Sequence, residues 1–249
     1  MQIHWTPIHR IVDENASVRT YLLERPAGFT WQEGARTHLG LPGFNAGDKP
    51  NRALVRHMSI ASTPEEDVVA ITTRLPAPCS EFKRVLQTLE VGTEVALFKT
   101  GSHLPLERSG RSIHLLSQGV GLATFRAHAV AYLRDSSQIR GLHSLNVASP
   151  GEALYADVFR PRPEQGFTAT LVHDRHTFQA EARALARDRD ALFYVVGSDA
   201  FLMQTAALLL SEGVDASQIR LDKHAHERPR FLGAVAPAEQ AKAISGASA

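Results

Sequence analysis

The sequence holds little of several features that define large classes of protein. Its 249 residues include one cysteine, Cys79, which excludes a disulfide within the chain, an all-cysteine zinc site and an iron–sulfur cluster held by four cysteines. The 27 lysines and arginines against 26 aspartates and glutamates leave a net charge of +1, too small to attract nucleic acid or an anionic membrane. We therefore expect neither as a partner.

Long apolar runs and an export signal are missing as well. The run from Ala206 to Leu210 is far shorter than the ~20 residues that span a bilayer. Met1 to Trp5 lead into mixed polar sequence, without the basic start and apolar stretch of a signal peptide. With 43% hydrophobic and 21% charged residues, the chain is predicted to be an ordinary globular protein of the cytoplasm.

Short alternating or β-branched runs, separated by Gly, Pro, Asn and Asp, fill the first hundred positions. Such spacing predicts an antiparallel barrel. The six expected strands are Ile8 to Val12, Val18 to Leu23, Thr37 to Leu41, Leu54 to Ile60, Val68 to Arg74 and Glu94 to Phe98. One helix interrupts them, because Ser80 is a good N-cap and apolar residues at helical spacing follow it from Phe82 to Leu89.

Strands alternate with helices after Gly110, a pattern that predicts a mostly parallel, Rossmann-like sheet covered on both faces. The expected strands are Ile113 to Ser117, His143 to Ala148, Phe167 to His173, Leu192 to Val196 and Ile219 to Asp222, and the expected helices are Leu122 to Leu133, Gln179 to Arg187 and Phe201 to Leu210. We predict a barrel domain at 1–105 and an α/β domain at 106–233. Residues 234–249, rich in Ala, Ser and Gly, are expected to be a flexible tail.

Two motifs of the first half are candidate phosphate sites. Arg56 and Ser59 stand three apart at the end of a predicted strand, where a guanidinium and a hydroxyl can converge on one phosphate. Ser80 opens a helix whose first amides favour an anion, and Lys83 adds a positive charge one turn in. Each motif alone is more typical of a strand end or a simple cap, but a pyrophosphate needs several donors.

Two glycine turns of the second half stand at strand ends. Gly119 and Gly121 follow a strand and open a helix, although Thr124 stands where the full dinucleotide pattern has a third glycine. Gly197 and Ser198 repeat the strand–glycine–helix arrangement. In an open parallel sheet both turns lie at the carboxyl ends of strands, where ligands bind.

The order of these motifs resembles the ferredoxin–NADP reductase family. Arg56-His57-Met58-Ser59 is similar to the family's Arg-x-Tyr-Ser segment, and Ser80 stands at the family's serine at a helix start. Ser117 to Arg126 resembles the family's Ala-Gly-Gly-Ile-Gly-Ile-Thr-Pro-Phe-Arg stretch. With Gly92 to Val95 and Val196 to Ser198, the resemblance covers about Ile3 to Gly233.

This resemblance implies a barrel that holds FAD and a sheet domain that receives NADH or NADPH. The implied flavin residues are Arg56, His57, Met58, Ser59, Ile60, Ser80 and Lys83, and the implied dinucleotide residues are Gly119, Gly121, Thr124, Arg175, Gly197 and Ser198. Arg56 and Ser80 would hold the flavin pyrophosphate. Ser59 is the candidate catalytic residue, with its hydroxyl near flavin N5, and Cys79 would lie near the flavin phosphates without a redox role.

Several departures from the family pattern concern the nicotinamide side. Met58 replaces the tyrosine that stacks on the isoalloxazine, and a thioether packs on an aromatic face without a phenol hydrogen bond. Ala123-Thr124 replaces a Thr-Pro pair, Val196 replaces a cysteine, and Asp222 to His224 stand in the region of the family's C-terminal Glu-x-Phe.

The choice between NADH and NADPH stays open at the level of sequence. Ser149 stands where relatives that use NADPH often carry an arginine, whereas Arg175 is positioned like another arginine of those relatives that binds the 2′-phosphate. Ser149 therefore favours NADH, whereas Arg175 favours NADPH.

The implied activity is that of an FAD-dependent NAD(P)H oxidoreductase whose electrons go to a separate ferredoxin, flavodoxin, oxygenase component or small molecule. Two alternatives remain: a flavin-binding electron-transfer subunit or sensor with a degenerate nicotinamide site, and a binding protein without flavin. The basic stretch Lys223 to Arg230 is either a solvated segment or a docking edge for an acidic electron carrier. No metal is expected, because His224 and His226 beside Asp222 are more typical of a polar loop.

Overall fold

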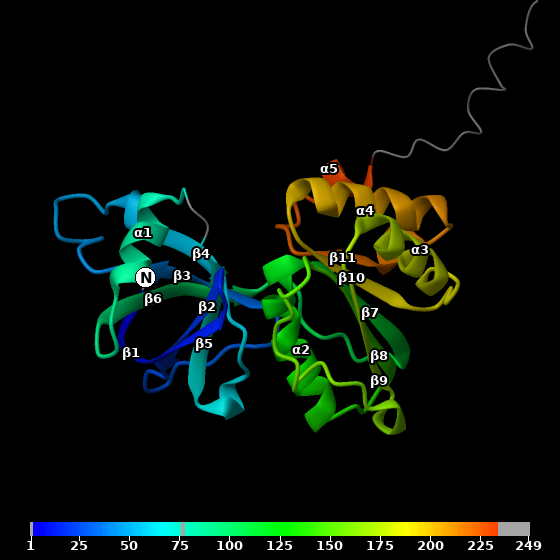
Figure 1. The fold of residues 1–249 in the computed structure, drawn as a ribbon, viewed down its shortest axis with the longest axis horizontal. Coiled ribbons are helices and arrows are strands. Elements are labelled where there is room, and N and C mark those ends of the chain that lie inside the picture. The colour runs from blue at the N-terminus through cyan, green and yellow to red at the C-terminus, as the bar shows by residue number, and fades with distance from the viewer. Residues whose placement is uncertain (1, 76–77, 234–249) are drawn as a thin grey trace, which may run out of the picture.

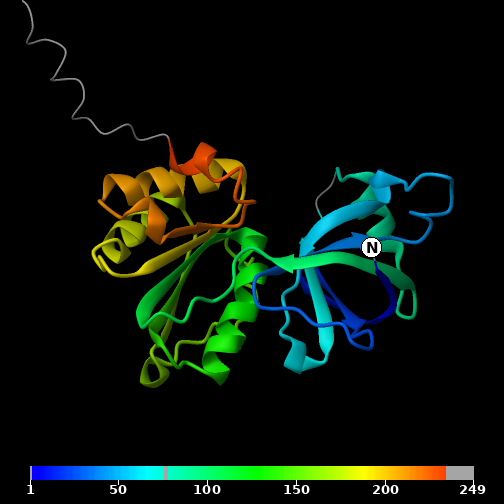
Figure 2. The same cartoon turned by 180° about the vertical axis from the view of Figure 1, so that it is seen from behind.

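Two sheets, each with its own helices, make up the molecule (Figures 1 and 2). The computed structural model describes residues 2–75 and 78–233, so the expected tail at 234–249 lies outside the described residues. The first sheet has six antiparallel strands in the order β4-β3-β6-β1-β2-β5, and the second has five parallel strands in the order β11-β10-β7-β8-β9. The predicted fold class is confirmed.

The first sheet and its helix form what we call the antiparallel unit. Its elements are β1 (Ile3–Asn15), β2 (Val18–Glu24), β3 (Ala35–Gly40), β4 (Val55–Ser59), β5 (Val68–Arg74), α1 (Glu81–Thr88) and β6 (Glu94–Ser102). The two edge strands approach each other, since Ala61 N–H beyond β4 donates to the carbonyl of Ala70 in β5 at 2.8 Å. Helix α1 buries Phe82 and Leu86 against the sheet core, as the apolar spacing predicts.

Strand β1 is longer than the sequence predicts. It begins at Ile3 and pairs with β6 through Pro7, then pairs with β2 from Ile8 onward. A register shift between Ile8 and Arg10 marks the change of partner. Because a bulge breaks the two-residue alternation, the pattern revealed only the second half of this strand.

The second sheet and its helices form the parallel unit. Its elements are β7 (Arg111–Gln118), α2 (Leu122–Arg134), β8 (Ile139–Val147), β9 (Phe167–Val172), α3 (Arg175–Leu185), β10 (Leu192–Val196), α4 (Asp199–Ser211), β11 (Ile219–Leu221) and α5 (Pro229–Leu232). Helix α2 covers one face through Phe125 and Tyr132. Helices α3 and α4 cover the other through Phe178 and Phe201. None of the helices in the described chain is long and apolar enough to cross a membrane.

The two units are joined by partly buried polar contacts along α2. Arg126 donates to both carboxylate oxygens of Glu66, at 2.6 and 3.0 Å, and to the carbonyl of Ala61 at 2.9 Å. Burial would raise the pKa of Glu66, but the hydrogen bonds from Arg126 bring that pKa below its ordinary value. The pair is therefore charged at neutral pH and fixes α2 against the antiparallel unit. The predicted domain boundary near residue 105 falls between β6 and β7 and stays a prediction.

Candidate functional site

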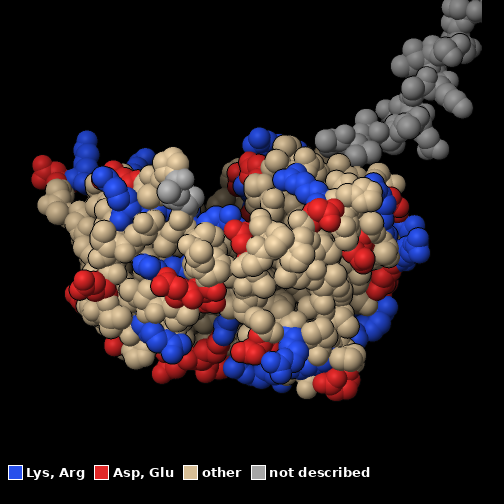
Figure 3. Space-filling view, viewed as in Figure 1, with Lys and Arg blue, Asp and Glu red and all other residues tan. Residues whose placement is uncertain are grey.

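A cavity of about 260 Å³ opens between the two units, and Figure 3 shows the molecule hollowed between them. We call it the interdomain cavity. Its lining from the antiparallel unit includes Arg36, His57, Met58, Ser59 and Thr72, and its lining from the parallel unit includes Gly121, Thr124, Val196, Gly197, Ser198 and Asp222. The strand-end motif of the first half and both glycine turns of the second half therefore meet at one place.

Two hydroxyls join the units inside this cavity. Thr124 Oγ1, in the first turn of α2, donates to Ser59 Oγ, at the end of β4, at 2.9 Å. The Thr124 side chain is buried, and Ser59 is partly buried. A ligand that reaches this pair would contact both units at once.

The neighbours of Ser59 in β4 differ in where their side chains lie. Met58 packs on the core of the antiparallel unit and also reaches the cavity. His57 is exposed and places Nε2 at 2.5 Å from Nε2 of His38, and burial together with nearby positive charge lowers the pKa of His57. The Ile60 side chain is wholly buried in the core, and its N–H donates to the carbonyl of Ala35, so its implied contact with a flavin stays a prediction.

The predicted phosphate residues gather around the start of α1. Ser80 caps the helix, and Lys83 lies in its first turn. The Arg56 guanidinium lies 5.5 Å from the ring centre of Phe82, also in that turn, and donates to the carbonyl of Val55 at 2.7 Å. Burial lowers the pKa of Lys83, and the positive charge of Arg74 adds to the shift. The helix start thus brings the positive charges of Arg56 and Lys83 close to the capping Ser80.

The two glycine turns need their glycines for different reasons. Gly119 has a φ of +52°, in the left-handed region that side chains rarely adopt. A Cβ on Gly121 would lie 3.0 Å from the carbonyl oxygen of Val196, and one on Gly197 would lie 2.6 Å from a ring carbon of Phe201. Backbone and rings therefore pack at the strand ends more closely than any larger residue allows.

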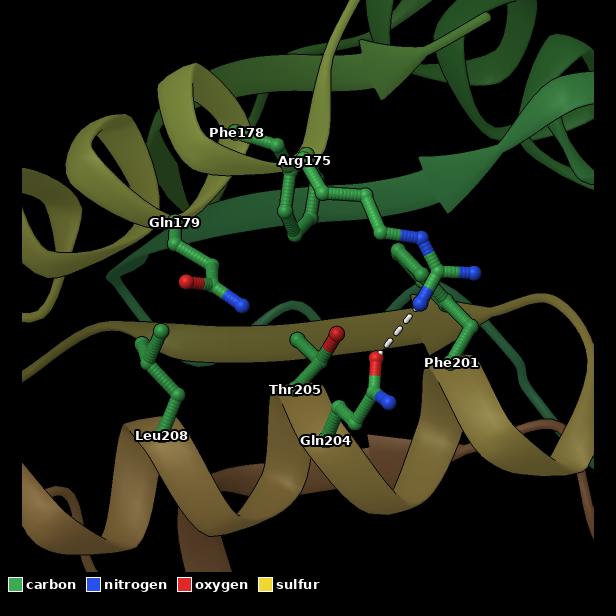
Figure 4. Close-up of a pocket in the computed structure, with 7 residues that line it drawn as sticks. All are labelled: Arg175, Phe178, Gln179, Phe201, Gln204, Thr205 and Leu208. Carbon is green, nitrogen blue, oxygen red and sulfur yellow. Dashed lines mark hydrogen bonds between the residues drawn. The ribbon is translucent and has the colours of Figure 1, made fainter.

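A second cavity, of about 370 Å³, lies over the carboxyl ends of β7, β8 and β9, and we call it the strand-end cavity. Gly119, Ser149 and Arg175 line it. Arg175 is exposed and donates to Oε1 of Gln204 in α4 at 2.7 Å, so its guanidinium is held over α4 (Figure 4). Ser198 Oγ caps α4 and donates to Gln118 at 3.2 Å, which ties the two turns together.

Two charge pairs that sequence reasoning missed also line these cavities. Asp222, which directly follows β11, is 4% exposed and accepts a hydrogen bond through Oδ2 from Arg36 of β3. Its Oδ1 is buried and has no hydrogen-bond partner within residues 2–75 and 78–233. Arg74, at the end of β5, pairs with Glu152 across the strand-end cavity at 2.5 Å. Nothing in the sequence pairs residues so far apart.

The basic stretch after β11 is largely engaged in the fold. Lys223 pairs with Asp199 at 2.7 Å, and Arg230 lies 3.8 Å from the same carboxylate. Arg228 donates to the carbonyl of His103 at 3.1 Å. Over the part of the chain that is described, no group of three or more potential ligands could hold a metal ion.

The six-stranded antiparallel unit and the five-stranded parallel unit make up a fold that this chain shares with solved ferredoxin–NADP reductases. The chain is similar to a ferredoxin NADP+ reductase from Neisseria gonorrhoeae with bound FAD and NADP, at a TM-score of 0.75 and 15% identity over 89% of this chain and 98% of that one. It is also similar to the flavohem-like FAD/NAD-binding domain of nitric oxide dioxygenase from Vibrio cholerae O1 biovar El Tor, at a TM-score of 0.69 and 18% identity over 87% and 96% of the two chains.

A ferredoxin-NADP+ reductase mutant from Plasmodium falciparum with 2′P-AMP has a TM-score of 0.72 at 12% identity over 88% and 95% of the two chains. No family model matches the sequence, and no curated protein matches it either. At identities this low the likeness establishes the fold, and the predicted resemblance is confirmed at that level.

Proposed function

We propose that the protein is an FAD-dependent NAD(P)H oxidoreductase that passes electrons to a separate acceptor. The observation that carries the proposal is the hydrogen bond between Ser59 and Thr124 inside the interdomain cavity. It joins the motif expected at flavin N5 to the turn expected beside the nicotinamide. The similar structure with bound FAD and NADP supports the same reading.

The residues present fit a flavin. The capped start of α1 supplies amides for a pyrophosphate, and Arg56 and Lys83 supply charge beside it. Met58 offers an apolar, polarizable surface to a ring in the interdomain cavity. Ser59 adds a hydroxyl whose position is fixed by Thr124. These contacts would orient the ring system with its reactive edge between the two units.

The residues of the strand-end cavity fit a pyridine dinucleotide. The amides of the Gly119–Gly121 turn at the start of α2 would bind its pyrophosphate, and Ser149 and Arg175 lie beside the path of its adenosine half. The nicotinamide would then reach the interdomain cavity beside Thr124. The proposal covers NADH and NADPH alike.

A bound flavin supplies the redox chemistry, accepting a hydride and releasing electrons to an acceptor. The protein's own residues would bind and orient the flavin and would exclude water from it. The acceptor is proposed to be a ferredoxin-, flavodoxin- or oxygenase-type protein or a small molecule, because one cysteine cannot hold a cluster within the chain. Within the basic stretch from Lys223 to Arg230, Lys223 and Arg230 share the single carboxylate of Asp199, so the stretch keeps a net positive charge that could contribute to docking.

The experiment is an anaerobic titration of the purified protein with NADH and with NADPH. We expect a flavin absorbance at about 450 nm that either coenzyme bleaches. A protein purified without flavin that also fails to take up added FAD contradicts the proposal. A flavin that neither coenzyme reduces contradicts the reductase activity and leaves a flavin-binding subunit.

A further inference from the structure

One ion pair crosses the mouth of the strand-end cavity and belongs to both units. Arg74 ends β5 of the antiparallel unit, and Glu152 lies in the segment between β8 and β9. Arg74 Nη2 donates to Glu152 Oε2 at 2.5 Å, and Ser17 donates to the other carboxylate oxygen at 3.4 Å. The carboxylate is thus held on the antiparallel unit, above the cavity where a dinucleotide is proposed to bind.

The guanidinium of this pair lies against the glycine turn. A Cβ placed on Gly119 would lie 3.8 Å from Arg74 Nη2, so the guanidinium borders the turn whose amides are proposed to bind pyrophosphate. Arg74 also lowers the pKa of Lys83 at the start of α1, which places the two cations in one corner of the molecule. In this corner, Glu152 is the carboxylate that Arg74 contacts.

The Arg74–Glu152 ion pair is weak enough for Arg74 to exchange Glu152 for another anion. Partial burial would raise the pKa of Glu152, but the hydrogen bond from Arg74 brings it below its ordinary value, so the carboxylate is ionised at neutral pH. The Arg74 and Glu152 side chains keep 38% and 21% of their surface exposed, and solvent screens pairs of this kind strongly. A phosphate offers the guanidinium more charge and a matching two-oxygen geometry.

Resting on the proposed function, we propose that Glu152 is a displaceable counter-ion of Arg74, and that the pyrophosphate of the incoming dinucleotide takes its place. Arg74 is then a phosphate-binding residue supplied by the antiparallel unit to a ligand of the parallel unit. Glu152 acts against binding, because the ligand must break an existing ion pair. Gly151, exposed and at a φ of +78°, precedes Glu152 and gives the segment a position at which it can turn away.

The test is a double-mutant cycle on dinucleotide affinity, measured by calorimetry with NAD⁺ and with NADP⁺ on the protein as purified. Glu152→Gln is expected to bind both ligands about fivefold more tightly, the upper range for loss of one exposed ion pair. Arg74→Gln is expected to bind both about tenfold more weakly or worse. The double variant should match Arg74→Gln, because Glu152 acts only through Arg74.

Glu164→Gln is the matched control, since Glu164 is an exposed carboxylate of the same segment between β8 and β9. It should leave both affinities unchanged. Unchanged or weaker binding by Glu152→Gln overturns the inference, as does equal tightening by that substitution in the Arg74→Gln background. An effect on NADP⁺ alone overturns the assignment to the pyrophosphate. A wild-type protein that binds neither dinucleotide overturns the proposed function itself.

Discussion

Acidification should destabilise the parallel unit through one buried histidine. His114 of β7 is 8% exposed, and neither ring nitrogen has a hydrogen-bond partner in the described chain. Burial, with a smaller effect of the neighbouring His143, lowers the pKa of His114 from 6.5 to about 4. Asp188, with Oδ2 at 3.8 Å from Nε2, opposes the shift without reversing it. The folded protein therefore keeps this ring neutral where an unfolded chain would protonate it.

The sign and size of the effect follow from the two pKa values. Below pH 6.5 His114 is protonated in the unfolded state, whereas in the folded state it stays neutral down to about pH 4. The free energy of unfolding therefore falls as pH falls through this window. At ~1.4 kcal/mol for each pH unit, the loss from His114 is about 2 kcal/mol at pH ~5 and about 3 kcal/mol when complete. His143 and His128 have lowered pKa values too, so wild type must be compared with a variant.

His114→Phe keeps a ring in the same place and removes the titration. Urea unfolding followed by far-UV circular dichroism, which reports chiefly on the helices of the parallel unit, gives the free energy of unfolding at each pH. Between pH ~8 and pH ~5 the variant should lose about 2 kcal/mol less than wild type. His176→Phe changes an exposed histidine of the same unit and is the matched control. Parallel curves for wild type and His114→Phe would refute the reasoning.

Three further substitutions probe the fold and the proposed site. Arg56→Ala should lose most of its bound flavin with an unchanged circular dichroism spectrum, measured as the ratio of flavin to protein absorbance, and full retention would contradict a pyrophosphate contact. Gly197→Ala should lower the free energy of unfolding in urea by about 1–3 kcal/mol, because the new Cβ would lie 2.6 Å from a ring carbon of Phe201. An unchanged unfolding midpoint would contradict that close packing. Arg126→Met should lower the free energy of unfolding by about 3 kcal/mol and speed proteolysis between the units, because it leaves the half-buried Glu66 charge unpaired. Proteolysis at the wild-type rate would contradict this role.

The sequence predicted elements best where one physical signal dominated. The ends of β5 and β10 coincide with their predictions, because both are runs of buried or β-branched residues bounded by turns. Helix α3 begins at Arg175, before the predicted start at Gln179. The signal for its true start was present: Asp174 accepts a hydrogen bond from Thr177 N–H at 2.8 Å, the geometry of an N-cap.

Charge pairs between the units could not be read from the sequence. Arg36 and Asp222 are separated by 186 positions, and no periodicity links residues on different sheets. Only the packed fold shows that Asp222, which follows β11, lies beside the interdomain cavity within reach of Arg36. The motif residues Ser59 and Thr124 were identified through a family pattern, whereas their mutual hydrogen bond required the structure.

The contacts between the units change in character from α2 to the strand-end cavity. Along α2, the Arg126 side chain is 19% exposed and donates two hydrogen bonds to Glu66, and Thr124 donates to Ser59 nearby. At the strand-end cavity, the Arg74 side chain is 38% exposed and donates one hydrogen bond to Glu152. Less exposed contacts with more hydrogen bonds cost more to break than screened ones, so Arg74 should exchange its partner more readily than the contacts along α2. A dinucleotide that exchanges partners on Arg74 would therefore enter without disturbing the hydroxyl pair at which its nicotinamide is proposed to react.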